Sequence, residues 1–413
     1  MKKFFLVYII FLIYLISNPV PIINDSRYTI HTSLSLIHQG NLDLDEYKSL
    51  IKHEKEWEYT IRTVNHHIYS IYPNGTVFFI TPVIFLLDKF GVILKESNLV
   101  LNNVDRIEVL LASFISALSA LPIYLISRER LRRWQSLLVV LIFSFGTSMW
   151  STASKALWQH DLSVLILSWS LHLLTTKKNI NDRYMYLGML LGFSINTRPT
   201  NIVPAVLLSI YIITSVDRRD KFLYMFSFLV PVLFLIFTSI LAYGTLLPLY
   251  YEPSFNNVGT SLSFQTLAGN MISPNRGLFV FSPILIFSFF GIYKTIKNKD
   301  KFSMICIFVL ICHFILISSY PQWWGGWSIG PRLWTDMMPF FIYFIILLLS
   351  NKARHYPLFV IFFFAFTVLS VIIHGKCSAS TNAMLWNDVS GSHKSIDDDP
   401  TRIWDYNDWQ VLR

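Results

Sequence analysis

Long apolar runs separated by short polar stretches dominate the chain. Runs such as 4–16, 137–145, 222–241 and 340–349 contain no charged residue. Each is long or dense enough to form a span, or the core of a span, of a hydrocarbon layer about 30 Å thick. Because helices satisfy all their backbone polar groups within one segment, this pattern predicts an all-α polytopic membrane protein.

The apolar runs predict about eleven membrane-spanning helices. They lie near residues 4–20, 107–127, 136–150, 161–175, 184–196, 199–215, 222–242, 277–293, 302–319, 333–350 and 356–374. The fifth and sixth are short. The first resembles a signal peptide, but Asn18 to Pro21 form a poor cleavage site, so we keep it as a span.

The segment TVFFITPVIFLL, residues 76–87, decides the orientation of everything after it. It has twelve residues, including Pro82, and is therefore short for a span and better suited to a re-entrant or surface segment. If it does not span, five Lys/Arg clusters all face the cytoplasm, and if it does, all five lie outside. The positive-inside rule favours the first alternative, with a cytoplasmic N-terminus and an outer C-terminus. The basic clusters are Arg128, Arg130, Arg132 and Arg133; Lys177, Lys178 and Arg183; Arg218, Arg219 and Lys221; Lys294, Lys297, Lys299 and Lys301; and Lys352 and Arg354.

The polar segments define the expected organisation. Residues 1–375 form one transmembrane domain, in which about 21–106 is a first outer loop, and residues 376–413 form an outer tail. Within the first loop, Tyr28, Leu34 and Ile37 could share one helical face that ends at Gly40, which predicts a helix lying along the membrane surface.

Composition narrows the class of function. The chain is 53% hydrophobic and 14% charged, whereas soluble domains average about 25% charged residues. Its three cysteines form neither a CxxC pair nor a disulfide framework, which argues against a structural zinc site. No GxxxxGK[ST], GxGxxG or HExxH motif supports nucleotide binding or zinc-protease chemistry. Aspartates in the tail could bind a divalent cation, but they lack calcium-loop spacing and are more typical of a solvated acidic run.

The stretch WWGGWSIGPR, residues 323–332, is the most unusual of the outer segments. It holds three tryptophans, three glycines and one proline in ten residues, which excludes the middle of a membrane helix. We interpret it as an ordered loop at the membrane surface that ends in the cation Arg332. An aromatic belt with a simple turn is the alternative.

Two acidic positions could carry chemistry. Asp25 follows the first span and could accept a proton from a hydroxyl or bind a metal, although an aspartate there is also a common helix N-cap. Lys155, Trp158, His160 and Asp161 occupy a turn between two spans. Adjacent His160 and Asp161 point in different directions on a helix, so they form no ready-made dyad, and they could also be solvated loop residues.

Three arginines are expected at the same outer face. Arg198 lies in NTRPTN, Arg276 in SPNRGLFVFSP, and Arg332 ends the tryptophan-rich loop. A guanidinium group binds phosphate oxygens in a planar fork, so these residues suit an anion at the interface. Snorkelling to the interface or an ordinary lipid headgroup would explain the same pattern.

The arrangement resembles the GT-C superfamily of membrane glycosyltransferases. It is most similar to the family 39-like branch that includes protein O-mannosyltransferases and the aminoarabinose transferase acting on lipid A. The resemblance covers roughly residues 1–350, while SPNRGLFVFSP, GGWSIGPR and the ending RIWDYNDWQ look like those of bacterial members. The matching stretches are NDSRY, HQGNLDLDEY, YPNGTVFFITPV, NTRPTN and WWGGWSIGPR.

The resemblance implies transfer of a sugar from a polyprenyl-phosphate donor to an acceptor hydroxyl at the outer face of a bacterial inner membrane. It implies Asp25 as catalytic base, with His160 or Asp161 as auxiliary groups that orient the acceptor or the base. The acceptor, whether lipid, glycan or protein, is left open, and so is a divalent cation, for which no ligands are assigned. No other cofactor and no nucleic acid is expected. The residues that would hold substrate or phosphate are Arg27, Lys155, Arg198, Arg276, Trp324, Trp327 and Arg332.

Two other functions fit part of the pattern. A lipid or solute transporter would use the same arginines to bind a headgroup, but transporters place polar residues and broken helices near the midplane. Here the polar residues gather towards one face, which favours interfacial chemistry. A catalytically silent scaffold of the same fold is the third possibility.

Overall fold

The computed structural model describes residues 2–18, 25–53, 55–93, 97–178, 180–251, 261–350, 357–388 and 394–413. Within these ranges the regular structure is helical apart from one antiparallel hairpin of β1 (Ile61–Val64) and β2 (His67–Ser70). The all-α fold class predicted from the apolar pattern is therefore confirmed. Asn24, the first residue of the NDSRY stretch, lies outside the described residues.

Every predicted span contains a helix. Among the described residues, five segments are long and apolar enough to cross a membrane: Val104–Arg128, Arg218–Tyr243, Lys301–Ser318, Arg332–Leu349 and Pro357–Ala379. The count of about eleven spans stays a prediction. Helix α1 (Lys2–Ile16) precedes the first outer loop. The α-helices from the end of that loop onward are α5 (Ser97–Leu118), α6 (Ala120–Arg128), α7 (Arg133–Phe145), α8 (His160–Thr175), α9 (Arg183–Thr197), α10 (Ile202–Ser215), α11 (Arg218–Tyr243), α12 (Phe264–Ile272), α13 (Leu278–Phe281), α14 (Ser288–Asn298), α15 (Lys301–Ser318), α16 (Met338–Leu349), α17 (Pro357–Ala379) and α18 (Thr381–Leu385).

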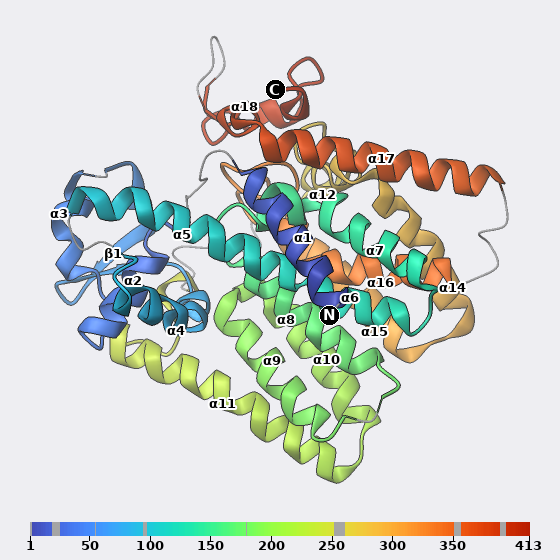
Figure 1. Cartoon of the computed structure of the whole chain (residues 1–413), viewed down its shortest axis with the longest axis horizontal. Coiled ribbons are helices and arrows are strands. Elements are labelled where there is room, and N and C mark those ends of the chain that lie inside the picture. Colours follow the sequence, from blue (N-terminus) through green and yellow to red (C-terminus); the bar gives the residue numbers. More distant parts are fainter. Residues whose placement is uncertain are drawn as a thin grey trace.

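The first outer loop folds into a lobe of its own. Its elements are α2 (Thr29–His38), α3 (Lys48–His53), the β-hairpin and α4 (Gly75–Lys89), and α5 joins this lobe to the helical body (Figure 1). The segment predicted to be re-entrant or superficial is the continuous helix α4, with Pro82 inside it.

Helix α2 differs from its prediction. Gly40 does follow the helix with a φ of +73°, as expected of a glycine just beyond a C-terminus. However, all residues from Ile30 to Ser35 are buried, and Ile30 and Leu34 pack against Ile80 and Ile84 of α4. A helix lying along a bilayer would keep a polar face in water, so α2 is a packed element within the lobe.

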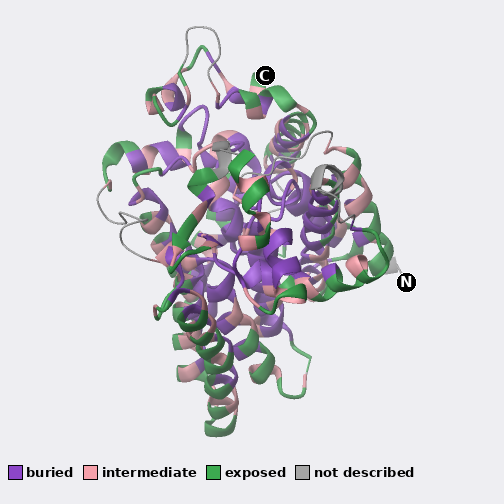
Figure 2. Ribbon diagram, turned by 90° about the vertical axis from the view of Figure 1, so that its left-hand side faces the viewer, coloured by how far each residue is buried: buried purple, intermediate pink, exposed green. Residues whose placement is uncertain are grey.

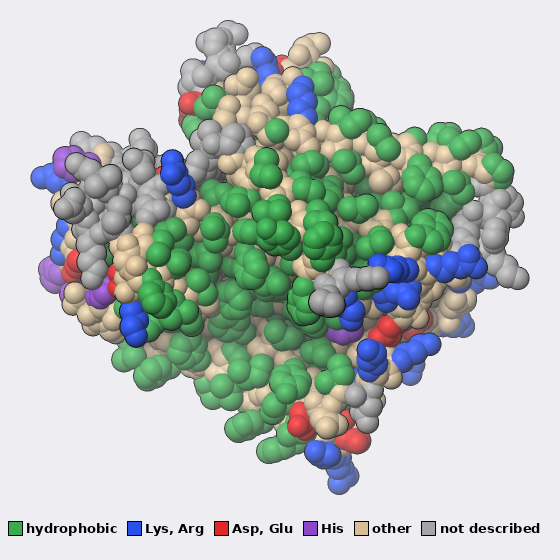
Figure 3. Space-filling model, in the orientation of Figure 1, with side chains coloured by type: hydrophobic (Ala, Val, Ile, Leu, Met, Phe, Trp, Pro, Cys, Tyr) green, Lys and Arg blue, Asp and Glu red, His purple; other side chains and the backbone are tan. Residues whose placement is uncertain are grey.

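The helical body has a buried centre and exposes apolar side chains on its outer surface, as a membrane protein does. Buried residues concentrate at the centre of the molecule (Figure 2), where α16 is buried along nearly its whole length. By contrast, α11 exposes large apolar side chains such as Phe222, Phe237 and Leu241. Hydrophobic side chains cover the middle of one face, and Lys and Arg gather at the lower right of the same view (Figure 3). Together with the long apolar helices, this surface is that of an integral membrane protein.

Two glycines let α9 and α11 pack backbone to backbone. A Cβ atom on Gly188 would lie 2.4 Å from the Tyr224 carbonyl oxygen, and one on Gly192 would lie 2.4 Å from the Phe228 carbonyl oxygen. Small residues four positions apart are the usual device for close helix contact in membranes.

We expect Gly192→Val to destabilise the protein by about 1–3 kcal/mol, because the added methyl groups force α9 away from α11. The midpoint of thermal unfolding in detergent should fall. Met189→Leu, on an exposed position of the same helix, should leave it unchanged. A Gly192→Val midpoint equal to that of the wild type would contradict this packing.

Candidate active site

Three helix ends and a turn after the first span bring together a group of charged side chains. We call Asp25, His160, Arg198, Arg332 and Asp336 the charged cluster. Asp25 follows the first span, His160 begins α8, Arg198 follows α9, and the last two belong to η7 (Arg332–Met337), a 3-10 helix before α16.

The charged cluster lies at the helix ends remote from the basic clusters. Helix α8 begins at His160 and runs into Lys177 and Lys178, while α9 begins at Arg183 and ends beside Arg198. Since consecutive helices reverse direction, the charges of the site and the basic turns occupy opposite ends of the same helices.

Asp25 and Arg332 form an ion pair across 307 residues of sequence. The sequence placed these two residues at one surface, and their proximity is confirmed. Burial alone would raise the pKa of the Asp25 carboxyl, but the Arg332 guanidinium outweighs it and holds the pKa below the ordinary value of 3.8. Burial raises the pKa of Tyr72 well above 10, so this phenol stays protonated and hydrogen-bonds the Asp25 carboxylate.

Arg332 is held from two further directions. Its guanidinium carbon lies 4.3 Å from the ring centroid of Trp158, a cation–π contact. Its Nε donates to His160 Nε2 at 3.3 Å. The tryptophan-rich loop that leads to Arg332 needs its glycines, since Gly330 has a φ of +57° and a Cβ there would lie 2.5 Å from the Phe281 ring.

His160 connects the two arginines of the cluster. Its Nδ1 lies 3.2 Å from Asp336 Oδ1, and its Nε2 lies 2.8 Å from Arg198 Nη1. These contacts assign a neutral imidazole that donates from Nδ1 to Asp336 and accepts at Nε2. His160 is fully buried and contacts both guanidinium groups.

Arg198 retains a free donor. Its Nε lies 3.0 Å from Asp336 Oδ2 and its Nη1 contacts His160. Its Nη2 makes no hydrogen bond with the described residues. The cluster therefore contains two arginines and two aspartates whose charges balance, with one guanidinium edge available to a ligand.

Arg276 is placed differently from the other two arginines. It is 1% exposed, and all five of its N–H donors are used. They bond to the backbone oxygens of Trp324, Asn275 and Gly326 and to the side chains of Gln410 and Asn387. Because no donor is left for a phosphate, we assign Arg276 to holding the tail against the tryptophan-rich loop.

The two tryptophans proposed for substrate binding also contact the tail. Trp324 Nε1 donates to Asp397 at 2.9 Å, and Trp327 Nε1 donates to Ser395 at 3.2 Å. Trp386, Ile396 and Ile403 of the tail pack in the same aromatic cluster. Asp397 accepts this indole N–H while it stays exposed, which agrees with a solvated acidic run at this position.

Three other predicted residues have hydrogen-bond or ion-pair partners outside the charged cluster. Lys155 Nζ donates to the backbone oxygens of Ser17 and Ser378, so it ties α1 to α17. Arg27 forms an ion pair with Asp105 at 2.9 Å. Asp161 accepts from the backbone N–H of Leu162. We leave these three out of the proposed site.

Asp336 is central to the cluster but is not among the site residues predicted from the sequence. It falls within the predicted span 333–350. An ionisable residue inside an apolar run is costly and usually has a partner, and that signal was present. Trp158 was named only as part of its turn, and Tyr72 not at all.

A comparison with protein families bears on this site. The model of the family described as dolichyl-phosphate-mannose-protein mannosyltransferase matches residues 91–243, which include His160 and Arg198. A search of curated proteins finds no match. The family match confirms the resemblance to GT-C glycosyltransferases and supports a membrane glycosyltransferase of that type.

Proposed function

We propose that this GT-C-like membrane glycosyltransferase moves a sugar from a polyprenyl-phosphate donor to an acceptor hydroxyl in the charged cluster. The observation that carries the proposal is the Asp25–Arg332 ion pair beside the free Nη2 of Arg198. A base next to phosphate-binding cations is what such a transfer requires. By the positive-inside rule the cluster lies at the outer face, with the N-terminus in the cytoplasm.

In the proposed reaction the acceptor oxygen bonds to the anomeric carbon of the sugar while the bond from that carbon to the phosphate oxygen breaks. The acceptor proton passes to Asp25, and the bonding electron pair leaves with the phosphate. Protonation of Asp25 turns the balanced cluster into one with a net charge of +1. This excess arises as negative charge develops on the leaving phosphate, which it stabilises.

The ion pair also provides a switch in basicity. In the free protein Arg332 lowers the pKa of Asp25, which makes the carboxylate a weak base. A donor phosphate that binds Arg332 and Arg198 replaces Asp25 as counter-ion. Since the favourable Coulomb interaction then weakens, the pKa of Asp25 rises and proton transfer becomes easier when donor is bound.

The test of the function is an assay with purified protein in vesicles. A polyprenyl-phosphate sugar labelled in the sugar is added with an extract of membranes as the acceptor source. Movement of label from the lipid to the acceptor, with release of polyprenyl phosphate, supports the proposal. Movement of intact labelled lipid across the bilayer without transfer supports the transporter and contradicts the proposal, and neither process would point to a silent scaffold.

Arg332→Lys should lower the rate of transfer by about 10²- to 10³-fold. A lysine ammonium is a single point charge and cannot hold Asp25, contact His160 and lie flat on Trp158 at once. The initial rate at saturating donor measures the effect. Lys297→Ala, in a basic cluster at the opposite helix ends, is the matched control and should keep the wild-type rate. Equal rates in both variants would remove Arg332 from the site.

A further inference from the structure

Three side chains of the lobe converge outside the charged cluster. The β1–β2 turn consists of Asn65 and His66, which have φ values of +50° and +68°. Two positive φ angles are typical of a tight type I′ hairpin turn. This turn fixes His67 as the first residue of β2, where it pairs with Val64.

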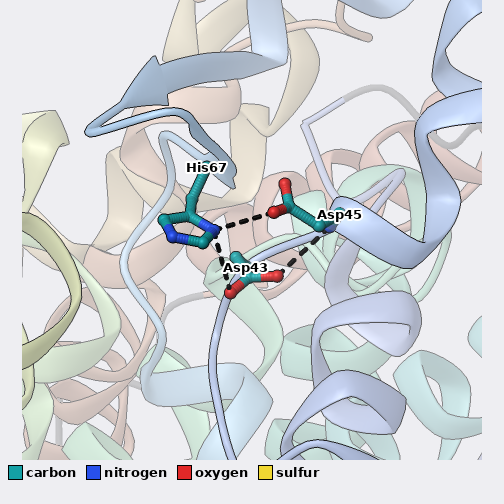
Figure 4. A group of neighbouring side chains, drawn as sticks. All are labelled: Asp43, Asp45 and His67. Atoms are coloured by element: carbon teal, nitrogen blue, oxygen red, sulfur yellow. Dashed lines mark hydrogen bonds and ion pairs between the residues drawn. The ribbon is translucent and has the colours of Figure 1, made fainter.

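The segment 43–45 lies along the other edge of β2. Asp43 forms a β-bridge with Tyr69, and the backbone N–H of Leu44 donates to the Ile68 carbonyl at 2.7 Å. The bridge brings Asp43 and Asp45 next to the side chain of His67. Figure 4 shows the three side chains pointing toward one another.

The distances among these side chains suit a common metal ion. His67 Nδ1 lies 2.7 Å from Asp45 Oδ2 and 3.8 Å from Asp43 Oδ2. Ligand atoms about 2.0–2.2 Å from one ion at tetrahedral angles lie about 3.4 Å apart. One observed distance is shorter than this value and the other is longer, so small side-chain movements would bring all three ligand atoms into position around one ion.

Asp43 is the independent sign that a cation belongs here. The residue is 5% exposed, and within the described part of the chain its Oδ1 accepts only from the Asp45 backbone N–H, at 3.2 Å. Its Oδ2 makes no hydrogen bond with the described residues, and no Lys or Arg among them pairs with it. Burying a carboxylate is unfavourable unless it is paired or binds a metal. By contrast, Asp45 has Lys48 Nζ at 3.2 Å.

We propose that Asp43, Asp45 and His67 bind a divalent transition-metal ion, with zinc bound most tightly among the ions tested below. Imidazole together with carboxylates suits zinc and manganese, and the general order of affinity places zinc above manganese. Calcium needs six to eight oxygen ligands, which this set does not offer. His67 and Asp45 are open to solvent, so water completes the coordination.

The ion would act as a clip within the lobe. It would join segment 43–45 to β2, whose Tyr69 packs edge-on against Tyr243 at 5.1 Å. Tyr72, which hydrogen-bonds Asp25, follows two residues after the end of β2. The metal site is thus distinct from the charged cluster but supports one of its walls, and it does not depend on the proposed reaction.

The test uses the full-length, tag-free protein in detergent after removal of metal with a chelator. Titration with zinc chloride, followed by calorimetry, should show one ion bound per chain, with weaker binding of manganese. His67→Ala and Asp43→Asn should each weaken zinc binding by more than about tenfold, since loss of even an outer partner of a metal ligand has that effect. A wild-type protein that binds no zinc, or variants that bind it as tightly as the wild type, would overturn the proposal.

Two further variants separate metal binding from general damage. His66→Asn changes the neighbouring histidine, which is outside the group, to a residue that tolerates its positive φ, so zinc binding should be unchanged. Lys48→Ala removes the cation that competes for Asp45 and should tighten zinc binding. Zinc should raise the thermal midpoint of the wild type and of His66→Asn but not of His67→Ala. The opposite behaviour of either control would contradict the assigned ligands.

Discussion

Asp25→Asn should lower the rate of sugar transfer by about 10²- to 10⁴-fold, the range expected for loss of a general base. The amide can still accept a hydrogen bond from Arg332, so the variant keeps much of the local geometry. It cannot take the acceptor proton, and it cannot produce the net positive charge that stabilises the leaving phosphate. Initial rates with labelled donor measure the loss, while donor affinity should be little changed or higher because Arg332 is no longer neutralised.

A matched control exists at the opposite end of the helices. Asp182 is exposed and has a φ of +53°, a conformation that asparagine adopts readily. Asp182→Asn removes the same charge in the same way and should keep the wild-type rate. If Asp25→Asn transfers sugar as fast as Asp182→Asn, Asp25 is not the base.

Asp336→Asn should destabilise the fold by about 3–5 kcal/mol, because it leaves the buried Arg198 guanidinium without its counter-ion. Asp336 is fully buried and contacts both Arg198 and His160. The effect should be visible as a large fall in the thermal midpoint in detergent and in the yield of folded protein.

The double variant Asp336→Asn/Arg198→Gln distinguishes an unpaired charge from lost packing. Removing both charges should recover a substantial part of the lost stability, although activity should stay low since Arg198 is gone. A double variant no more stable than Asp336→Asn would show that the two residues are not coupled in this way.

The sequence predicted which residues lie near the site better than it predicted which of them contact one another. Apolar run length predicted the helices, and charge sorting placed Asp25 and Arg332 at one surface although 307 residues separate them. The same charge pattern also predicted Arg276 at this surface. Its five donors face the tail, and nothing in the residue types distinguishes a guanidinium that holds backbone oxygens from one that waits for a phosphate.

Contacts that depend on tertiary packing could not be predicted from the pattern of apolar and polar residues. Asp43 and His67 meet only because a hairpin turn and a β-bridge set their register. Helix α2 has the periodicity of a surface helix, but its burial depends on α4, which lies far along the chain. Asp336 is the exception, since a lone aspartate in an apolar run could have been identified from sequence.

The central claim is that the charged cluster binds the phosphate of the donor. A structure of the protein in a lipid nanodisc with added polyprenyl phosphate tests it most directly. We expect phosphate density within about 3 Å of Arg198 and Arg332, the distance of charge-assisted hydrogen bonds, with Asp25 released from Arg332. Phosphate bound elsewhere, with the Asp25–Arg332 ion pair intact, would contradict the account.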